Sequence, residues 1–290
     1  MSSAAGWQSG ATGLVVVALP AAGYLAGRVR LASRGGHWPL ARDGAFAGGW
    51  LCVAIAVASP LAARDEQFPV HVVQHILLGV LAPVLLALSG PVTLLLRVST
   101  PAVRRFVTRV LRSRAVGWLS WAPVGAVLSV GAMYPLYLTG IYRFTLRHPL
   151  AHAALHAHML LAGCLFAWAL VGVDPVHNRG SWRVRLVALT GALAAHAILA
   201  LYLYVHAGAL AQPGVTGTSG DWRLGAEILW YGGDAADLAV IVAFFGQWYR
   251  RGGRELRRQR ELQAVGVRGA ASTDRPRPYE PQAGAGPLPE

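Results

Sequence analysis

Residues 70–96 read VHVVQHILLGVLAPVLLALSGPVTLLL, a stretch without aspartate, glutamate, lysine or arginine. A helix needs about 20 such residues to cross a hydrocarbon core of roughly 30 Å. The stretch lacks the alternation of apolar and polar residues that is typical of a barrel strand. It therefore predicts a membrane-spanning helix, because only helices and closed barrels satisfy their backbone hydrogen bonds inside lipid.

Six further stretches share this character. Only 13% of the 290 residues are charged, about half the share that is usual in a soluble domain. The seven predicted spans are 13–31, 44–62, 70–96, 117–140, 150–173, 184–206 and 224–249. The expected fold class is all-α, a polytopic transmembrane helical bundle over residues 1–251. A tail follows at 252–290, basic at first and then rich in Pro, Gly and Ala. Its polar part, 254–263, could continue the last span as a helix, and we expect the remainder to be disordered.

Arginine supplies all 26 basic residues, and the chain has no lysine. Twenty-two of these arginines fall on one side of the predicted spans and four on the other. The positive-inside rule then places the N-terminus outside and the C-terminus in the cytoplasm. The net charge of +13 therefore reflects topology and favours anionic lipid, not nucleic acid, as a partner. Between residues 97 and 114, apolar residues recur at helical spacing, which predicts an amphipathic helix at the membrane interface.

Histidines gather at the predicted outer ends of the spans. His71 and His75 are four residues apart, and His152 and His156 repeat this interval on another span. This spacing places both rings of a pair on one helical face. Imidazole is a common ligand of copper, zinc and haem iron, so the two pairs predict a metal site at the extracytoplasmic face. Additional ligands or neighbours of this site would be His148, His206, Gln74 and Tyr137.

The last predicted span carries the acids Glu227, Asp234 and Asp237, at intervals that put them on one helical stripe. Acids inside a membrane are costly and usually face the bundle interior or a water-filled cavity. They could belong to the site, or only pair with an arginine or a histidine to hold the bundle together. His196 lies in the middle of its span, where we expect it to hydrogen-bond a neighbouring helix.

Three stretches carry a resemblance to the CtaG-type cytochrome c oxidase assembly factors. Residues 71–78, HVVQHILL, with the following Ala-Pro and Gly-Pro pairs, are similar to the HxxQHxLL…AP…GxP block of that family. Residues 134–137, YPLY, followed by the histidines of the fifth span and Trp168, resemble its PLY…H…H pattern. Residues 221–230, DWRLGAEILW, resemble its DQxLGGxxMW element. Together they cover roughly residues 45–250.

The resemblance implies a multi-pass protein of the bacterial cytoplasmic membrane that is not an enzyme. It implies a role in maturing cytochrome c oxidase, with oxidase subunits as partners and delivery of copper to the subunit II centre as the usual proposal. Histidines and acids without thiolates suit Cu(II) and Zn(II) as well as Cu(I). The methionine of the third element is Leu229 here, which leaves Met133 and Met159 near the outer half of the membrane.

Two other functions use the same residues. A haem-binding b-type cytochrome would ligate iron through these histidines, although axial histidines usually come one per helix. A metal or proton transporter would use the acids of the last span, and it would need inverted repeats or broken helices. A retinal protein is excluded because its Schiff base requires a lysine. The sequence has no Ser/His/Asp arrangement and no glycine-rich phosphate loop that would indicate an enzyme.

Overall fold

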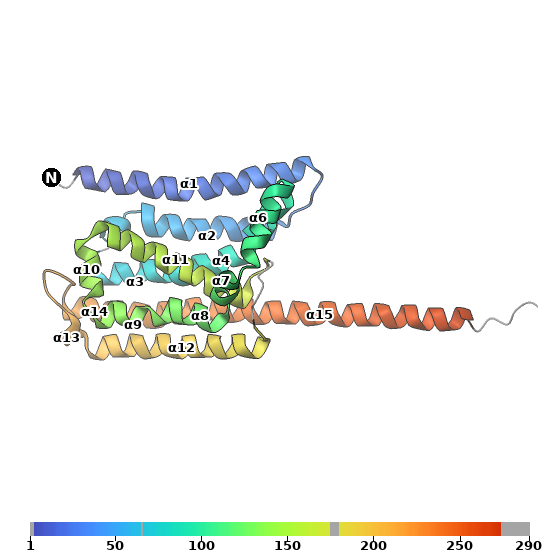
Figure 1. Ribbon diagram of the computed structural model, residues 1–290. Helices are drawn as coiled ribbons and strands as arrows, with labels where there is room; N and C mark the ends of the chain where they lie inside the picture. Colours follow the sequence, from blue (N-terminus) through green and yellow to red (C-terminus); the bar gives the residue numbers. More distant parts are fainter. Residues whose placement is uncertain (1–2, 65, 175–179, 274–290) are drawn as a thin grey trace, which may run out of the picture. The chain divides into compact units, whose positions relative to one another are not determined.

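The computed structural model describes residues 3–64, 66–174 and 180–273 (Figure 1). Apart from an isolated β-bridge between Gln212 and Gly217, all regular secondary structure in these ranges is helical, which confirms the predicted class. The chain divides into two units, Met1–Phe244 and Phe245–Glu290. The packing described below is that of the first unit.

The helices follow one another through short connections, and three of them contain a π-helical turn. In chain order the elements are α1 (Ser3–Ser33), α2 (Leu40–Ala58), η1 (Ala62–Arg64), α3 (Phe68–Ile76), η2 (Leu77–Leu81), α4 (Ala82–Ser89), α5 (Pro91–Val98), α6 (Pro101–Leu111), α7 (Arg114–Leu119), α8 (Ala122–Ala126), η3 (Val127–Gly131), α9 (Met133–Leu138), α10 (Ile141–Arg147), α11 (Pro149–Val171), α12 (Trp182–Val205), α13 (Ala207–Leu210), α14 (Ser219–Glu227), η4 (Ile228–Gly232) and α15 (Gly233–Thr273). The π-helical turns are η2, η3 and η4.

Five helical stretches among the described residues are long and apolar enough to cross a membrane, and a sixth candidate is bent. The five are Leu40–Ala58, Phe68–Val98, Pro149–Val171, Trp182–Val205 and Ser219–Arg250. The sixth joins Ala122–Leu138 to Ile141–Arg147 through a bend of 83°. These stretches correspond to the second to seventh predicted spans, so the chain is a multi-pass membrane protein.

The first predicted span, 13–31, lies in α1, which is helical but is not among the candidate spans found in the described residues. The fourth predicted span also differs, since it was expected to begin at residue 117. That residue belongs to α7, which ends at Leu119, and a new helix begins at Ala122, with Pro123 in its first turn. Proline is favoured there because the first turn of a helix needs no donor from its own backbone.

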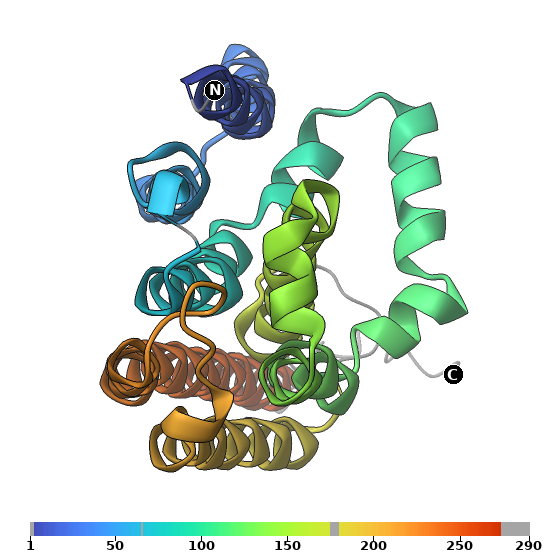
Figure 2. The same ribbon diagram turned by 90° about the vertical axis from the view of Figure 1, so that its left-hand side faces the viewer.

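Five members of the bundle close a ring around a common interior. The stretch from α3 to α4 contacts α11, and α11 contacts α8. The ring continues from α8 to α12 and from α12 to α14, which returns to α3. α2 packs on the outer side of α4, and α1 packs on α2. Figure 2 looks along the long helices and shows α1 and α2 to one side of the remaining members.

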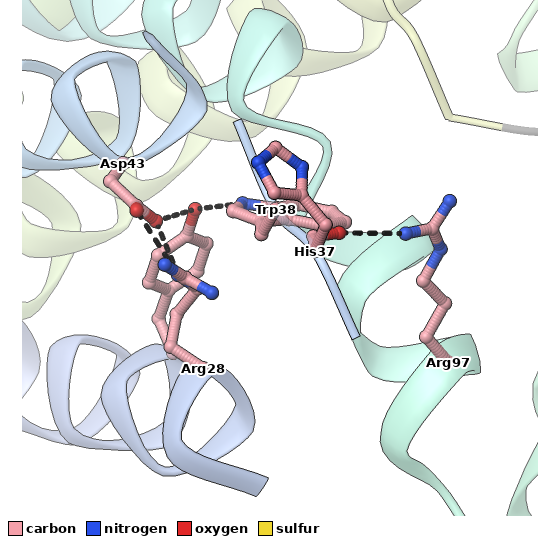
Figure 3. Close-up of polar contacts among 6 residues, drawn as sticks. Arg28, His37, Trp38, Asp43 and Arg97 are labelled. Carbon is pink, nitrogen blue, oxygen red and sulfur yellow. Dashed lines mark hydrogen bonds and ion pairs between the residues drawn. The ribbon is translucent and has the colours of Figure 1, made fainter. Parts of the chain in front are cut away.

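A polar network joins α1 to α2 (Figure 3). The Arg28 Nε group donates hydrogen bonds to both carboxylate oxygens of Asp43, at 2.8 and 3.1 Å. The Tyr24 hydroxyl donates to the same carboxylate at 3.0 Å and accepts a hydrogen bond from Trp38 Nε1 at 2.9 Å. The network therefore links α1 to the first turn of α2.

The basic segment after α5 forms the amphipathic helix that the sequence predicted. α6 begins at Pro101 after Thr100, whose side chain caps it by accepting a hydrogen bond from the Val103 backbone. Its apolar residues are not buried by the protein, since Phe106 is 64% exposed. Figures 1 and 2 agree that α6 runs across the direction of the long helices, the orientation expected of a helix that lies in a membrane interface.

The last helix, α15, continues to Thr273. It therefore includes residues 254–263, which the sequence allowed as a helical continuation of the last span, and extends to residue 273, into the part expected to be disordered. The segment 252–273 is rich in Arg, Glu, Leu, Gln and Ala, residues with high intrinsic helix propensity. The remainder of the predicted tail, 274–290, lies outside the described residues.

Candidate metal centre

Three histidines from two helices meet in the first unit. His71 comes from α3, and His152 and His156 come from α11. One ligand nitrogen from each ring lies within 4.8 Å of a nitrogen of the other two. We call these three residues the outer histidine cluster.

Helical spacing and one interhelical contact build the outer histidine cluster. His152 and His156 are one turn apart on α11, and their ring centroids are 4.5 Å apart. The centroid of the His71 ring lies 6.0 Å from that of His152 and 6.2 Å from that of His156. α11 packs against η2 and α4, which continue the helix that carries His71.

Burial and hydrogen bonding test whether the cluster suits a metal ion. His71 is completely buried, and among the described residues neither of its ring nitrogens has a hydrogen-bond partner. A buried polar group without a partner is costly. Nitrogen ligands bind zinc at about 2.0–2.1 Å, so two ligands of one tetrahedral ion are roughly 3.4 Å apart. The three nitrogens lie within 4.8 Å of one another. Small rotations of the rings would shorten these distances to about 3.4 Å, so the three residues fit a metal ion.

Aromatic side chains wall off one side of the outer histidine cluster. The Tyr142 ring centroid is 4.8 Å from that of His71, and the Tyr137 centroid is 6.0 Å away. Behind them, the buried Phe68 ring stacks on Trp222, with centroids 4.0 Å apart. This stack requires the glycine at position 225, because a Cβ there would overlap the Phe68 ring.

An open pocket of about 280 Å³ lies on the other side of this wall. Tyr137, Tyr142 and Trp222 line it together with Arg143, whose guanidinium donates a hydrogen bond to Gln212 Oε1 at 2.7 Å. The same two tyrosines therefore contact the His71 ring and border the pocket. We call this pocket the vestibule.

His75 and Gln74 do not join the outer histidine cluster. His75 is buried one turn further along α3 and lines a separate cavity of about 40 Å³ that His196 also lines. Gln74 is buried, and its Nε2 group donates a hydrogen bond to the carbonyl oxygen of Ala56 at 3.0 Å. It therefore links α3 to α2, away from α11.

Two other predicted site residues are exposed and bonded elsewhere. The ring of His148 stacks on Phe144, and its Nδ1 lies 2.8 Å from the carbonyl oxygen of that residue. The ring of His206 stacks on Tyr202, and its Nδ1 lies 3.0 Å from the carbonyl oxygen of that residue. Neither histidine belongs to the outer histidine cluster.

The three acids of the last span do not share one inward-facing stripe. Glu227 and Asp234 are exposed, and Asp237 is half-buried and lies 3.3 Å from His196 Nδ1. The expectation of one stripe assumed a regular helix, but the π-helical turn η4 separates Glu227 from the other two acids. A π-helical turn inserts about one extra residue and rotates everything after it by roughly 100°.

Sequence reasoning did not identify Tyr142 as a neighbour of the site. It lies on α10, beyond the 83° bend, in a segment expected to be a loop. The sequence pattern around a tyrosine between two predicted spans does not indicate that its side chain lies next to a metal site. His196 was expected to hydrogen-bond a neighbouring helix, and it does so through Asp237 of α15.

Comparison with known proteins identifies the family. The model of the cytochrome c oxidase caa3 assembly factor family matches residues 22–251. An uncharacterised protein of Mycobacterium leprae is 31% identical over 260 residues, which are 83% of this chain and 38% of that protein. One of Mycobacterium bovis is 32% identical over 268 residues, 86% of this chain and 40% of that protein. The chain thus spans about two fifths of the length of these relatives, and no solved structure matches it. By the family match and by its own motifs, the chain belongs to the cytochrome c oxidase caa3 assembly factor family.

Proposed function

We propose that this chain is a membrane assembly factor for cytochrome c oxidase, without enzymatic activity of its own, that carries copper at the outer histidine cluster. Copper is the cargo, and oxidase subunits are the partners that receive it. Family membership supports the role in assembly. The choice of copper follows the resemblance to the family, and the donors, three imidazoles with no thiolate among them, are compatible with it.

One observation carries the proposal. His71 is completely buried next to two other imidazoles, and no described residue forms a hydrogen bond to either of its ring nitrogens. A packing role would not require three imidazoles to converge. A metal ion would satisfy the nitrogen and offset the cost of burying it.

The proposed topology places the outer histidine cluster near the extracytoplasmic face. It has seven spans, with α1 as the first, the N-terminus outside and the C-terminus in the cytoplasm of a bacterial cell. The arginine distribution supports it. The vestibule then opens toward the compartment in which the oxidase copper centre matures, and the arginines of α6 face anionic lipid headgroups on the cytoplasmic side.

The packing of the three rings argues against haem. Their centroids are 4.5 to 6.2 Å apart. A porphyrin held between two axial histidines would have to separate two of these rings and fill the space between them. Zinc satisfies the same donors as copper, so the experiment includes both metals.

The test measures metal content and optical absorbance of the detergent-purified protein after loading with copper or zinc. We expect copper retained by the wild type and by His158→Ala, a control on the same helix whose ring bonds to the carbonyl oxygen of Leu128. His71→Ala and His156→Ala should lose the copper of the outer histidine cluster, so that they hold less copper than the wild type, and should fail to support oxidase maturation in host membranes. A Soret band would indicate the cytochrome instead. A copper content equal to that of the wild type in both folded variants, with active oxidase, would overturn the proposal.

A further inference from the structure

A second group of potential ligands surrounds the cavity of about 40 Å³ that His75 and His196 line. We call it the inner cavity. Its lining residues come from α3, α4, α9, α11, α12 and α15 and from the π-helical turns η2 and η3. Most lining residues are apolar, Met133 among them, and the exceptions include His75, His196 and Asp237. This volume holds on the order of two or three water molecules, so a metal ion with a water would fit.

Two imidazole nitrogens at the inner cavity are buried without a partner. Among the described residues, nothing forms a hydrogen bond to His75 Nδ1 or to His196 Nε2. His75 is 5% exposed and His196 6%. Buried imidazoles normally satisfy their nitrogens, and two exceptions on one small cavity indicate a missing partner.

Asp237 favours one tautomer of the His196 imidazole. Its carboxylate oxygen lies 3.3 Å from His196 Nδ1. A carboxylate accepts a hydrogen bond, so it holds the proton on Nδ1 and leaves the lone pair of Nε2 available. This carboxylate–histidine pair is the usual support of a metal-bound imidazole.

The backbone is irregular at the same depth. The π-helical turn η2 begins two residues after His75 and supplies Gly79 and Val80 to the inner cavity. The turn η3 supplies Ser129 and Val130. The turn η4 ends immediately before Gly233, where a Cβ would overlap the His196 ring. π-helical turns occur frequently at functional sites, and here two of them line one cavity and the third ends beside a histidine that lines it.

We propose that the inner cavity is a second copper site, in which the imidazoles of His75 and His196 and the thioether of Met133 bind Cu(I). Thioether and imidazole donors without a thiolate favour Cu(I) over zinc, and the Asp237 carboxylate balances the added charge. His71 and His75 lie one turn apart on α3, so the two sites are successive positions for the same ion. This inference deepens the proposed function and rests on copper as its cargo.

The experiment titrates the purified full chain with Cu(I) under anaerobic conditions, in competition with a chromogenic chelator. The wild type should bind two Cu(I) ions, and His71→Ala and His196→Ala should each bind one. Leu193→Ala is the matched control, because it enlarges the inner cavity without removing a donor, and it should bind two. Size-exclusion profiles identify any variant that has not folded, and His196→Gln then replaces His196→Ala.

Two further variants test the assigned roles. Asp237→Asn should weaken the inner site about 10- to 100-fold, the usual effect of removing the support of a metal ligand. Met133→Leu should abolish the copper–sulfur scattering seen by X-ray absorption. One ion in the wild type that depends on His71 and not on His196 overturns the inner site and leaves the proposed function intact. One ion that depends on His196 alone overturns the outer site, and no bound ion overturns both.

Discussion

At the residue scale, one turn of α3 separates two histidines that have different neighbours. His71 meets His152 and His156 of α11, whereas His75 lines the inner cavity with His196 of α12. Imidazole chemistry is the same in each case, so the surrounding donors decide what each position binds. The outer position offers nitrogen alone, and the inner one adds the sulfur of Met133 and the support of an acid.

Two histidines one turn apart on the fifth span provide a sharp comparison. We predict that His152→Ala lowers the copper affinity of the outer site by roughly 10²- to 10³-fold. The reason is that the binding free energy of a four-ligand zinc site is about 10–16 kcal/mol, so that each ligand contributes roughly a quarter of it. His148→Ala should change it less than threefold, because that ring stacks on Phe144 outside the outer histidine cluster. Competition titrations of both variants measure this. Equal losses would mean that His148 is also a ligand.

At the element scale, helix packing determines which side chains meet. α14 approaches α3 so closely that position 225 has no room for a side chain beside the Phe68 ring. The stacked Phe68 and Trp222 rings, together with Tyr142, then form the wall between the vestibule and His71. A change of helix separation at this contact would alter the wall and the cluster together.

Gly225→Ala tests this packing. We predict destabilisation of about 1–3 kcal/mol, the usual cost of overpacking a filled interior, together with weaker copper binding at the outer site. Gly191→Ala is the control, because a Cβ at that exposed position meets nothing within 4 Å. It should be neutral or slightly stabilising, since alanine is the better helix former. Thermal unfolding in detergent measures both variants. No difference between them would contradict the close approach of α14 and α3.

Hydropathy predicted the location of six helical stretches, because each contains a long, mostly apolar run. The i, i+4 spacing likewise predicted that His152 and His156 act together. Other features depend on contacts that spacing does not encode. The π-helical turn η4 interrupts the regular spacing between Glu227 and Asp237, and the 83° bend brings Tyr142 to His71. Sequence spacing made His71 and His75 equivalent, and only the packing of α11 and α12 separates them.

At the scale of the whole molecule, the vestibule, the outer histidine cluster and the inner cavity are successive neighbours. Tyr137 and Tyr142 join the first to the second, and one turn of α3 joins the second to the third. In the proposed function, an ion that passes the aromatic wall would occupy these positions in this order. The direction of this order across the membrane depends on the topology that the arginines favour.

Reporter fusions test that topology. A fluorescent reporter that folds only in the cytoplasm, fused after Thr273, should be active, and an exported phosphatase at the same position should not. The reason is that 22 of the 26 arginines lie on the side of this terminus. A fusion in the connection between α13 and α14 should give the reverse pattern. Phosphatase activity after Thr273 would place the outer histidine cluster at the cytoplasmic face.

The central claim is that His71, His152 and His156 bind one copper ion together. Pulsed electron paramagnetic resonance detects the remote nitrogen of each imidazole bound to Cu(II), and His196→Ala protein loaded with one Cu(II) isolates the outer site. We predict the signal of several equivalent imidazoles, which disappears when His71, His152 and His156 are all replaced by alanine. A Cu(II) spectrum without imidazole coupling, or one unchanged in the triple variant, would show that these three histidines do not bind copper together.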